Sequence, residues 1–123
     1  MDSVYEMLFD YISDLEIIDT HEHLPACEDA WERPNDVLRD YLTHYFSRDL
    51  VSAGLTFEQV EWARDVSVPL MERWELLEPY WDAARHTGYG RSLTLAVQGL
   101  YGIDDISRDT IEELDHRFQE ALH

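Results

Sequence analysis

The sequence predicts a mainly helical fold with one short β-strand. Through most of the 123 residues, apolar side chains recur at spacings of three and four, the period of an amphipathic helix. Only LEIIDTH, residues 15–21, has strand character, which its Ile-Ile pair carries. We therefore expect a single segment over residues 1–123: an N-terminal helix, a strand at about 15–23, and a helical region at about 35–122.

The first helix is expected over residues 3–13. Ser3 and Glu6 have the spacing of a capping box, in which each side chain satisfies a backbone N–H of the other residue. The residues that follow place one apolar stripe along the helix: Val4, Leu8, Tyr11, Ile12 and Leu15.

The predicted strand raises the question of its partner. A lone strand cannot satisfy its own backbone groups, so it must pair with another chain or belong to a larger fold. Its unpaired edge favours a homo-oligomer or contact with the remainder of a longer chain. A loop at residues 24–34, punctuated by Pro25 and Pro34, follows the strand.

The rest of the chain predicts helices. Asn35 is the expected cap of a helix that runs to about Val51, and Pro79 is expected to kink or divide a later helix. The two glycines of HTGYG predict a break at residues 86–90. The expected helices span 35–51, 56–65, 67–81, 91–100 with Leu93, Val97 and Leu100 on one side, and a last one from Ser107 with Ile111, Leu114 and Phe118 buried.

The charge balance excludes some partners. There are 27 acids against 9 bases, all of them Arg, for a net charge of −18. Such a surface repels nucleic acid and anionic membranes and attracts divalent cations. Cys27 is the only cysteine, so no internal disulfide forms. The start MDSVYEML has acids where a signal peptide carries positive charge, and no apolar run is long enough to span a bilayer, so we expect a cytoplasmic protein.

Two histidines close the predicted strand. Successive strand side chains alternate between faces, so Asp19, His21 and His23 share one face. Two imidazoles at i and i+2 can converge on one ion, and neutral imidazole is a common ligand of divalent transition metals. Asp19 can orient a ligand or join the coordination. Cys27 is a weaker third candidate, because a single loop cysteine is more often structural or incidental.

The run IIDTHEHL resembles the first barrel strand of the amidohydrolase superfamily of metal-dependent hydrolases. The preceding helix, the helical region that follows and WELLEPYWDAARHTGYGRSLTLAVQGLYGI are similar to the uronate isomerase-like branch. The resemblance implies that His21 and His23 bind a divalent metal, Zn²⁺ first among the candidates, with Asp19 beside them. It also implies that this chain is an N-terminal fragment of a (β/α)₈ TIM barrel, covering about the opening third and inactive alone.

Three functions follow from these observations. The first is a metal-dependent hydrolase in which the ion activates water. The second is isomerisation of a uronate by proton transfer. The third is a non-enzymatic, acidic helical interaction module. The catalytic residues are not identified by the sequence.

A second candidate site is ARHTGYGR, residues 84–91. Arg85, His86 and Arg91 surround a glycine-rich stretch, and guanidinium groups bind carboxylates with two parallel hydrogen bonds. A small, carboxylated substrate would need such contacts. The alternative is a turn between helices whose basic groups meet nearby acids.

Overall fold

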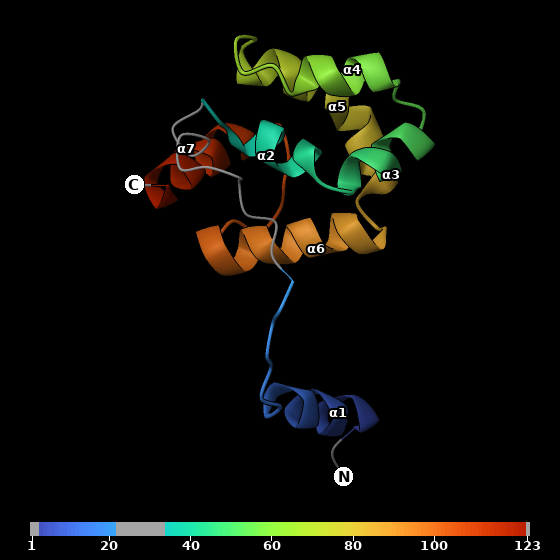
Figure 1. Cartoon of the computed structure of the whole chain (residues 1–123), viewed down its shortest axis with the longest axis vertical. Helices are drawn as coiled ribbons and strands as arrows, with labels where there is room; N and C mark the ends of the chain where they lie inside the picture. Colours follow the sequence, from blue (N-terminus) through green and yellow to red (C-terminus); the bar gives the residue numbers. More distant parts are fainter. Residues whose placement is uncertain (1–2, 22–33, 123) are drawn as a thin grey trace. The chain divides into compact units, whose positions relative to one another are not determined.

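The computed structural model describes residues 3–21 and 34–122, and the chain divides into two compact units, Met1–Arg33 and Pro34–His123 (Figure 1). Within the described residues all the regular structure is helical. The elements are α1 (Val4–Ser13), α2 (Val37–Thr43), α3 (Phe46–Ser52), α4 (Phe57–Ala63), α5 (Leu70–Ala84), α6 (Gly88–Ala96), the π-helix η2 (Val97–Tyr101) and α7 (Ile111–Ala121).

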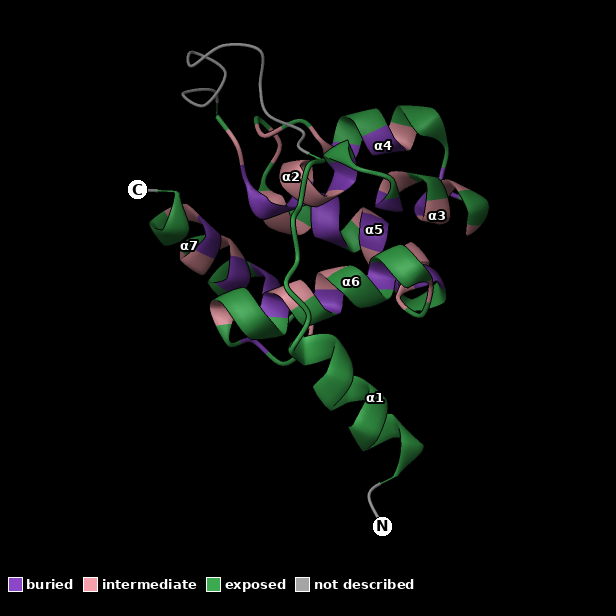
Figure 2. Ribbon diagram, turned by 60° about the horizontal axis from the view of Figure 1, so that its bottom comes forward, coloured by how far each residue is buried: buried purple, intermediate pink, exposed green. Residues whose placement is uncertain are grey.

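The N-terminal unit contains α1, and the predicted helix is confirmed. Ser3 Oγ accepts from the Glu6 N–H at 3.2 Å, and a Glu6 carboxylate oxygen accepts from the Ser3 N–H at 2.7 Å. This capping box satisfies two backbone donors that a helix start otherwise leaves open. No residue of α1 is buried, as Figure 2 shows by its uniform green.

The prediction of a strand at about 15–23 is wrong over its described part. Residues 15–21 form no strand, so the chain as described is all-helical and shows no part of a (β/α)₈ barrel. A strand needs a hydrogen-bonded neighbour, and residues 3–21 and 34–122 form no other strand that could pair with it. Ile17 and Ile18 remain 80% and 81% exposed.

The C-terminal unit has its own apolar core. α5 contacts α3, α4 and α7, while α2 contacts α3, α4 and α7 (Figure 1). Trp74, Leu77 and Trp81 supply the buried face of α5. The predicted stripe of the last helix is confirmed, since Ile111, Leu114 and Phe118 are all buried. The helix itself begins at Ile111 rather than Ser107 because residues 107–110 form a turn.

The helix predicted over 35–51 is two helices. Asp36, rather than Asn35, caps α2, because its Oδ1 accepts from the Arg39 N–H at 2.9 Å. His44 then adopts an extended backbone, with φ −97° and ψ −172°. The interruption separates α2 from α3, which contacts both α5 and α6.

Pro79 does not divide α5, which is continuous from Leu70 to Ala84. Proline removes one backbone donor, which would have bonded to the Glu75 carbonyl four residues earlier. Both Pro79 and Glu75 are exposed, so water can take up that bond.

The break predicted at residues 86–90 is shorter than expected. Thr87 caps α6 by accepting from the Gly90 N–H at 3.1 Å, so both glycines lie inside the helix. Gly90 is needed for packing: a Cβ there would lie 2.6 Å from the Ala84 carbonyl oxygen and 2.8 Å from Arg85 Cα. The glycines mark a close approach of α6 to the end of α5.

The π-helix η2 changes the buried face after α6. Leu100 was expected to lie on the same side of the helix as Leu93 and Val97, but its side chain is 74% exposed. A π-helix takes more residues per turn than an α-helix, so it rotates Leu100 outward. Ile103 is buried beyond it, after Gly102 ends the turn in the left-handed region at φ 62°.

Candidate functional site

The described part of the histidine motif is accessible. Asp19, Thr20 and His21 are all exposed. The Asp19 carboxylate accepts from the His21 backbone N–H at 3.0 Å, which holds the acid next to the histidine by a local turn of the Asx type. An acid and an imidazole, both open to solvent, therefore lie two residues apart.

The other two candidate ligands of the predicted metal site come from a segment that the structure does not describe. His23 and Cys27 lie outside the described residues. Among residues 3–21 and 34–122, no three His, Cys, Asp or Glu side chains gather closely enough to hold a metal ion. Asp19 and His21 thus offer two donor groups of kinds that suit a divalent transition metal, fewer than the four of a typical zinc site.

Arg85 is committed to internal contacts. Its Nη2 donates to both carboxylate oxygens of Asp105, each at 2.6 Å, and its guanidinium lies 5.8 Å from the centre of the Trp81 ring. The hydrogen bond to Asp105 raises the pKa of Arg85. This contact corresponds to the alternative given in the sequence analysis, a turn between helices whose basic groups meet nearby acids. The Arg85 guanidinium connects the end of α5 to Asp105 in the segment before α7.

His86 and Arg91, the other two residues of this candidate site, are exposed. Over the described chain, neither forms an ion pair with Arg85's partners or with any other acid. Between them, the Thr87 hydroxyl donates to Asp49 Oδ2 at 2.5 Å and so fixes the start of α6 to α3. Of the three predicted residues, Arg85 is therefore already held by Asp105, whereas His86 and Arg91 are exposed.

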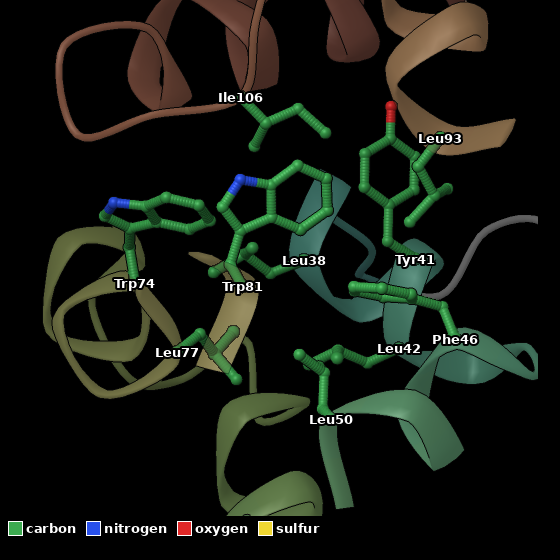
Figure 3. Close-up of a pocket in the computed structure, with 10 residues that line it drawn as sticks. All are labelled: Leu38, Tyr41, Leu42, Phe46, Leu50, Trp74, Leu77, Trp81, Leu93 and Ile106. Atoms are coloured by element: carbon green, nitrogen blue, oxygen red, sulfur yellow. The ribbon is translucent and has the colours of Figure 1, made fainter. Parts of the chain in front are cut away.

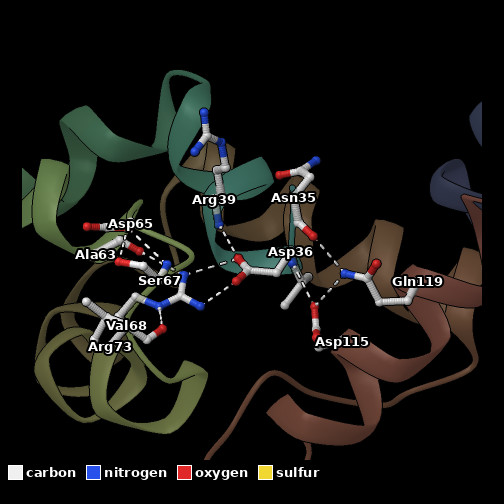
Figure 4. Close-up of polar contacts among 11 residues, drawn as sticks. Asn35, Asp36, Arg39, Ala63, Asp65, Ser67, Val68, Arg73, Asp115 and Gln119 are labelled. Carbon is white, nitrogen blue, oxygen red and sulfur yellow. Dashed lines mark hydrogen bonds and ion pairs between the residues drawn. The ribbon is translucent and has the colours of Figure 1, made fainter. Parts of the chain in front are cut away.

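Sequence reasoning did not identify a buried ion pair between Arg73 and Asp36 (Figure 4). Arg73 is 1% exposed. Its Nη1 donates to Asp36 Oδ1 and to the Ala63 carbonyl, both at 3.2 Å, its Nε donates to the Val68 carbonyl at 2.8 Å, and its Nη2 pairs with Asp36 Oδ2. The sequence could have indicated that Arg73 is buried, because Arg73 lies beside Trp74 within the apolar stripe of α5.

Asp36 is the centre of this polar cluster. Besides the Arg73 guanidinium, it accepts from the Arg39 N–H that begins α2. Nearby, Asp115 of α7 accepts from the Val37 N–H at 3.0 Å, and Gln119 donates to the Asn35 carbonyl at 2.8 Å (Figure 4). These contacts hold the start of α2 from two directions, so the cluster stabilises the fold.

The core contains a small apolar cavity of about 20 Å³ (Figure 3). Around it, the Tyr41 hydroxyl and the Nε1 atoms of Trp74 and Trp81 are buried and have no hydrogen-bond partner. Burial, together with the nearby Tyr101 and Asp40, raises the pKa of Tyr41. The volume suits at most one water molecule, so the cavity is not a substrate pocket.

An open polar groove lies between α2 and α4. It is lined by Arg39, Thr43, Glu61, Arg64 and Asp65. Arg64 pairs with Glu61 at 2.6 Å, and hydrogen bonds from Ser67 lower the pKa of the Asp65 carboxyl. The mixture of paired acids and bases gives the groove no preference for one sign of charge.

No family model, curated protein or solved structure matches this chain. Across the described residues, none of the helices has the length and apolar character to cross a membrane.

Proposed function

We propose that His21 and His23 bind a divalent metal ion, Zn²⁺ first, and that the chain is the N-terminal part of an amidohydrolase-like, metal-dependent enzyme. The observation that carries the proposal is the motif IIDTHEHL, in which an acid and two alternating histidines end an apolar run. The exposure of Asp19 and His21 supports it, because a ligand side chain must reach the ion. The net charge of −18 favours cation binding further.

The residues of this chain would act by binding and orientation. His21 and His23 would each donate one ring nitrogen as neutral imidazole. Asp19, held by the His21 backbone, would either orient an imidazole or add a carboxylate oxygen. When bound, the ion supplies the Lewis acidity that activates water for hydrolysis. Further ligands and the general base would come from residues 22–33 or from other polypeptide.

Isomerisation of a uronate is the alternative reaction within this proposal. It would need a group that binds the substrate carboxylate. Arg91 and His86 are exposed and accessible to such a carboxylate, whereas Arg85 is already held by Asp105. Hydrolysis does not require Arg91 to bind a substrate carboxylate. The charge of the substrate that is converted would therefore distinguish isomerisation from hydrolysis.

The test is a zinc titration by isothermal calorimetry of the full chain, with the variants His21→Ala and His23→Ala. His116→Ala is the matched control, since His116 is an exposed helical histidine paired with Glu120 on α7. We expect binding by the wild type and by the control, and at least tenfold weaker binding by each motif variant. Equal binding by all four proteins, or by none, would contradict the proposal.

A non-enzymatic helical module is the second candidate. The closed core of Pro34–His123 and the internal pairing of Arg85 support it, because both commit side chains to the fold itself. A chain that unfolds cooperatively yet does not bind zinc would favour this candidate over the metal enzyme.

A further inference from the structure

The groove between α2 and α4 contains an arginine without an acidic partner. Arg39 of α2 is half-buried, and its guanidinium points away from the pair of Arg73 and Asp36 (Figure 4). Across the described chain this guanidinium forms no hydrogen bond and no ion pair, whereas its backbone N–H donates to Asp36. The chain has 27 acids against 9 bases, so acidic partners are plentiful. The Arg39 guanidinium is therefore free to bind an acceptor from outside the chain.

Arg64 adds a second guanidinium to the same groove. It donates to Glu61 through Nη1 at 2.6 Å, and its Nη2 forms no hydrogen bond with any described residue. A guanidinium presents its N–H groups in a planar fork that matches the two oxygens of a carboxylate. Arg39 and Arg64 thus line one groove with donors that suit a carboxylate.

Asp65 gives the groove a charge of the opposite sign. Its Oδ1 accepts from the N–H and the hydroxyl of Ser67, at 2.9 and 2.7 Å, and its Oδ2 has no partner among the described residues. These bonds first, and then the nearby guanidiniums of Arg73 and Arg39, lower the pKa of the Asp65 carboxyl, so it is ionised at pH 7. Arg39 is near enough to Asp65 for this effect but forms no ion pair with it. One small ligand can therefore meet both charges.

The two signs of charge select the kind of ligand. A simple anion would be repelled by Glu61, Asp65 and the net charge of −18, and a simple cation by the two arginines. The groove has a volume of about 450 Å³, within the range of roughly 300–1,000 Å³ that small-molecule sites occupy. We propose that this groove binds a small zwitterionic amino acid, with its carboxylate on Arg39 and Arg64 and its ammonium group on Asp65. This inference goes beyond the metal site and does not depend on it.

The test is a heteronuclear NMR titration of the isotope-labelled full chain in metal-free buffer at pH 7. The ligands are glycine, β-alanine and γ-aminobutyrate, in which the ammonium group lies progressively farther from the carboxylate. Propionate and propylammonium, which carry one charge each, are the ligand controls. We expect saturable shifts at the backbone amides of Arg39, Thr43 and Arg64. At least one amino acid should bind at least about tenfold more tightly than either control.

Three variants separate the two charges. Arg39→Gln removes the free guanidinium and should weaken amino-acid binding at least about tenfold. Asp65→Asn keeps an oxygen for Ser67 but removes the charge, so it should weaken amino-acid binding and leave propionate binding unchanged or tighter. Arg48→Gln is the matched control, because Arg48 is an exposed arginine of α3 that lies over the Phe57 ring without an ion pair. It changes the net charge equally and should bind as the wild type does.

Three outcomes would overturn the proposal. The absence of saturable shifts with all three amino acids would show that the groove is closed to them. Propionate that binds as tightly as the amino acids would make the groove a plain anion site. Equal affinities of the wild type and Arg39→Gln would place the ligand elsewhere. Because the buffer contains no metal, none of these outcomes bears on zinc binding by His21 and His23.

Discussion

Tyr41 has a buried hydroxyl with no hydrogen-bond partner. A buried donor without a partner loses its bonds to water and gains none in the protein. Its ring nevertheless packs among the core side chains beside Leu93 (Figure 3). The aromatic ring of Tyr41 therefore stabilises the core, whereas its hydroxyl group does not.

We predict that Tyr41→Phe leaves stability at pH 7 unchanged or raises it by up to about 2 kcal/mol, because it removes an unsatisfied polar group. The pKa of Tyr41 is raised in the folded state by burial, and that of Tyr101 by burial and by Asp40. The folded chain thus holds these phenol protons more tightly than the unfolded chain. Their contribution is present below the ordinary pKa of about 10 and falls as pH rises above it.

Urea unfolding at pH 8 and at about pH 11 would measure this difference. Tyr41→Phe should lose less stability between the two pH values than the wild type does. An equal loss would mean that Tyr41 ionises with its ordinary pKa. Tyr5→Phe, at an exposed position of α1, is the control and should match the wild type.

Arg73 presents the opposite situation, a buried charge whose partners are all provided by the fold. We predict that Arg73→Ala destabilises the chain by about 3–5 kcal/mol, because Asp36 then keeps a buried charge without its counterion. Thermal and urea unfolding would measure the loss.

Arg108→Ala is the matched control for Arg73. Arg108 also pairs with two acids, Glu75 and Glu78, but it lies on the surface. Its loss should change stability by about 1 kcal/mol or less. Equal effects of the two variants would contradict the importance assigned to burial.

At the scale of the element, the junction of α5 and α6 depends on the absence of one side chain. Gly90 lies against the backbone of Ala84 and Arg85, where a Cβ would meet atoms that cannot rotate away. Gly88 lies in the same first turn of α6, but a Cβ added there would meet no atom within 4 Å.

We predict that Gly90→Ala destabilises the chain by about 1–3 kcal/mol or more, through overpacking of a contact with the backbone. Gly88→Ala should be neutral or stabilising by up to about 1 kcal/mol, because alanine favours the helical state. Melting temperatures of the two variants compare the same chemical change with and without a clash. A lower melting temperature for Gly88→Ala than for Gly90→Ala would exclude this explanation.

Helix ends and buried stripes were predictable because they depend on local spacing. Ser3 with Glu6 forms the expected capping box, and the same spacing gives a second one at Thr56 and Gln59. The glycines of α6 were misread because sequence does not distinguish a glycine that breaks a helix from one that lets two helices approach. The exposure of Leu100 was equally difficult to predict from the sequence, since a π-turn changes the residue period on which the prediction of a buried stripe depends.

At the scale of the whole molecule, repulsion opposes compaction. The net charge is −18 in 123 residues, and folding brings these acids closer together. Most of the described ion pairs lie on the surface, where each contributes little.

We predict that the melting temperature rises as NaCl increases from about 20 mM to about 500 mM. Added salt shortens the Debye length, which is about 10 Å at 0.1 M, and so weakens the repulsion between the acidic side chains. Differential scanning calorimetry would measure the shift, and KCl at equal ionic strength should give the same result. A melting temperature that falls with salt would mean that surface ion pairs outweigh the repulsion.

Long-range pairing was the least predictable property. The IIDTHEHL segment has the residues of a strand, but whether a strand forms depends on a neighbour that the local sequence does not specify. The buried pair of Asp36 and Arg73 was unpredictable for the same reason, because the two residues are 37 positions apart in the sequence. The proximity of Asp19 to His21 follows from their spacing, whereas any further ligands of the proposed metal site would require contacts that spacing does not encode.

The burial of Arg73 also makes proteolysis informative. The chain has no lysine, so trypsin can cut it only after arginine. Exposed arginines such as Arg91 lie open in the native fold, but the Arg73 side chain is held between Asp36 and two backbone carbonyls. A protease that must bind this side chain has to wait until α5 separates from its neighbours. The rate at which the fragment ending at Arg73 accumulates therefore reports how often α5 separates from these neighbours.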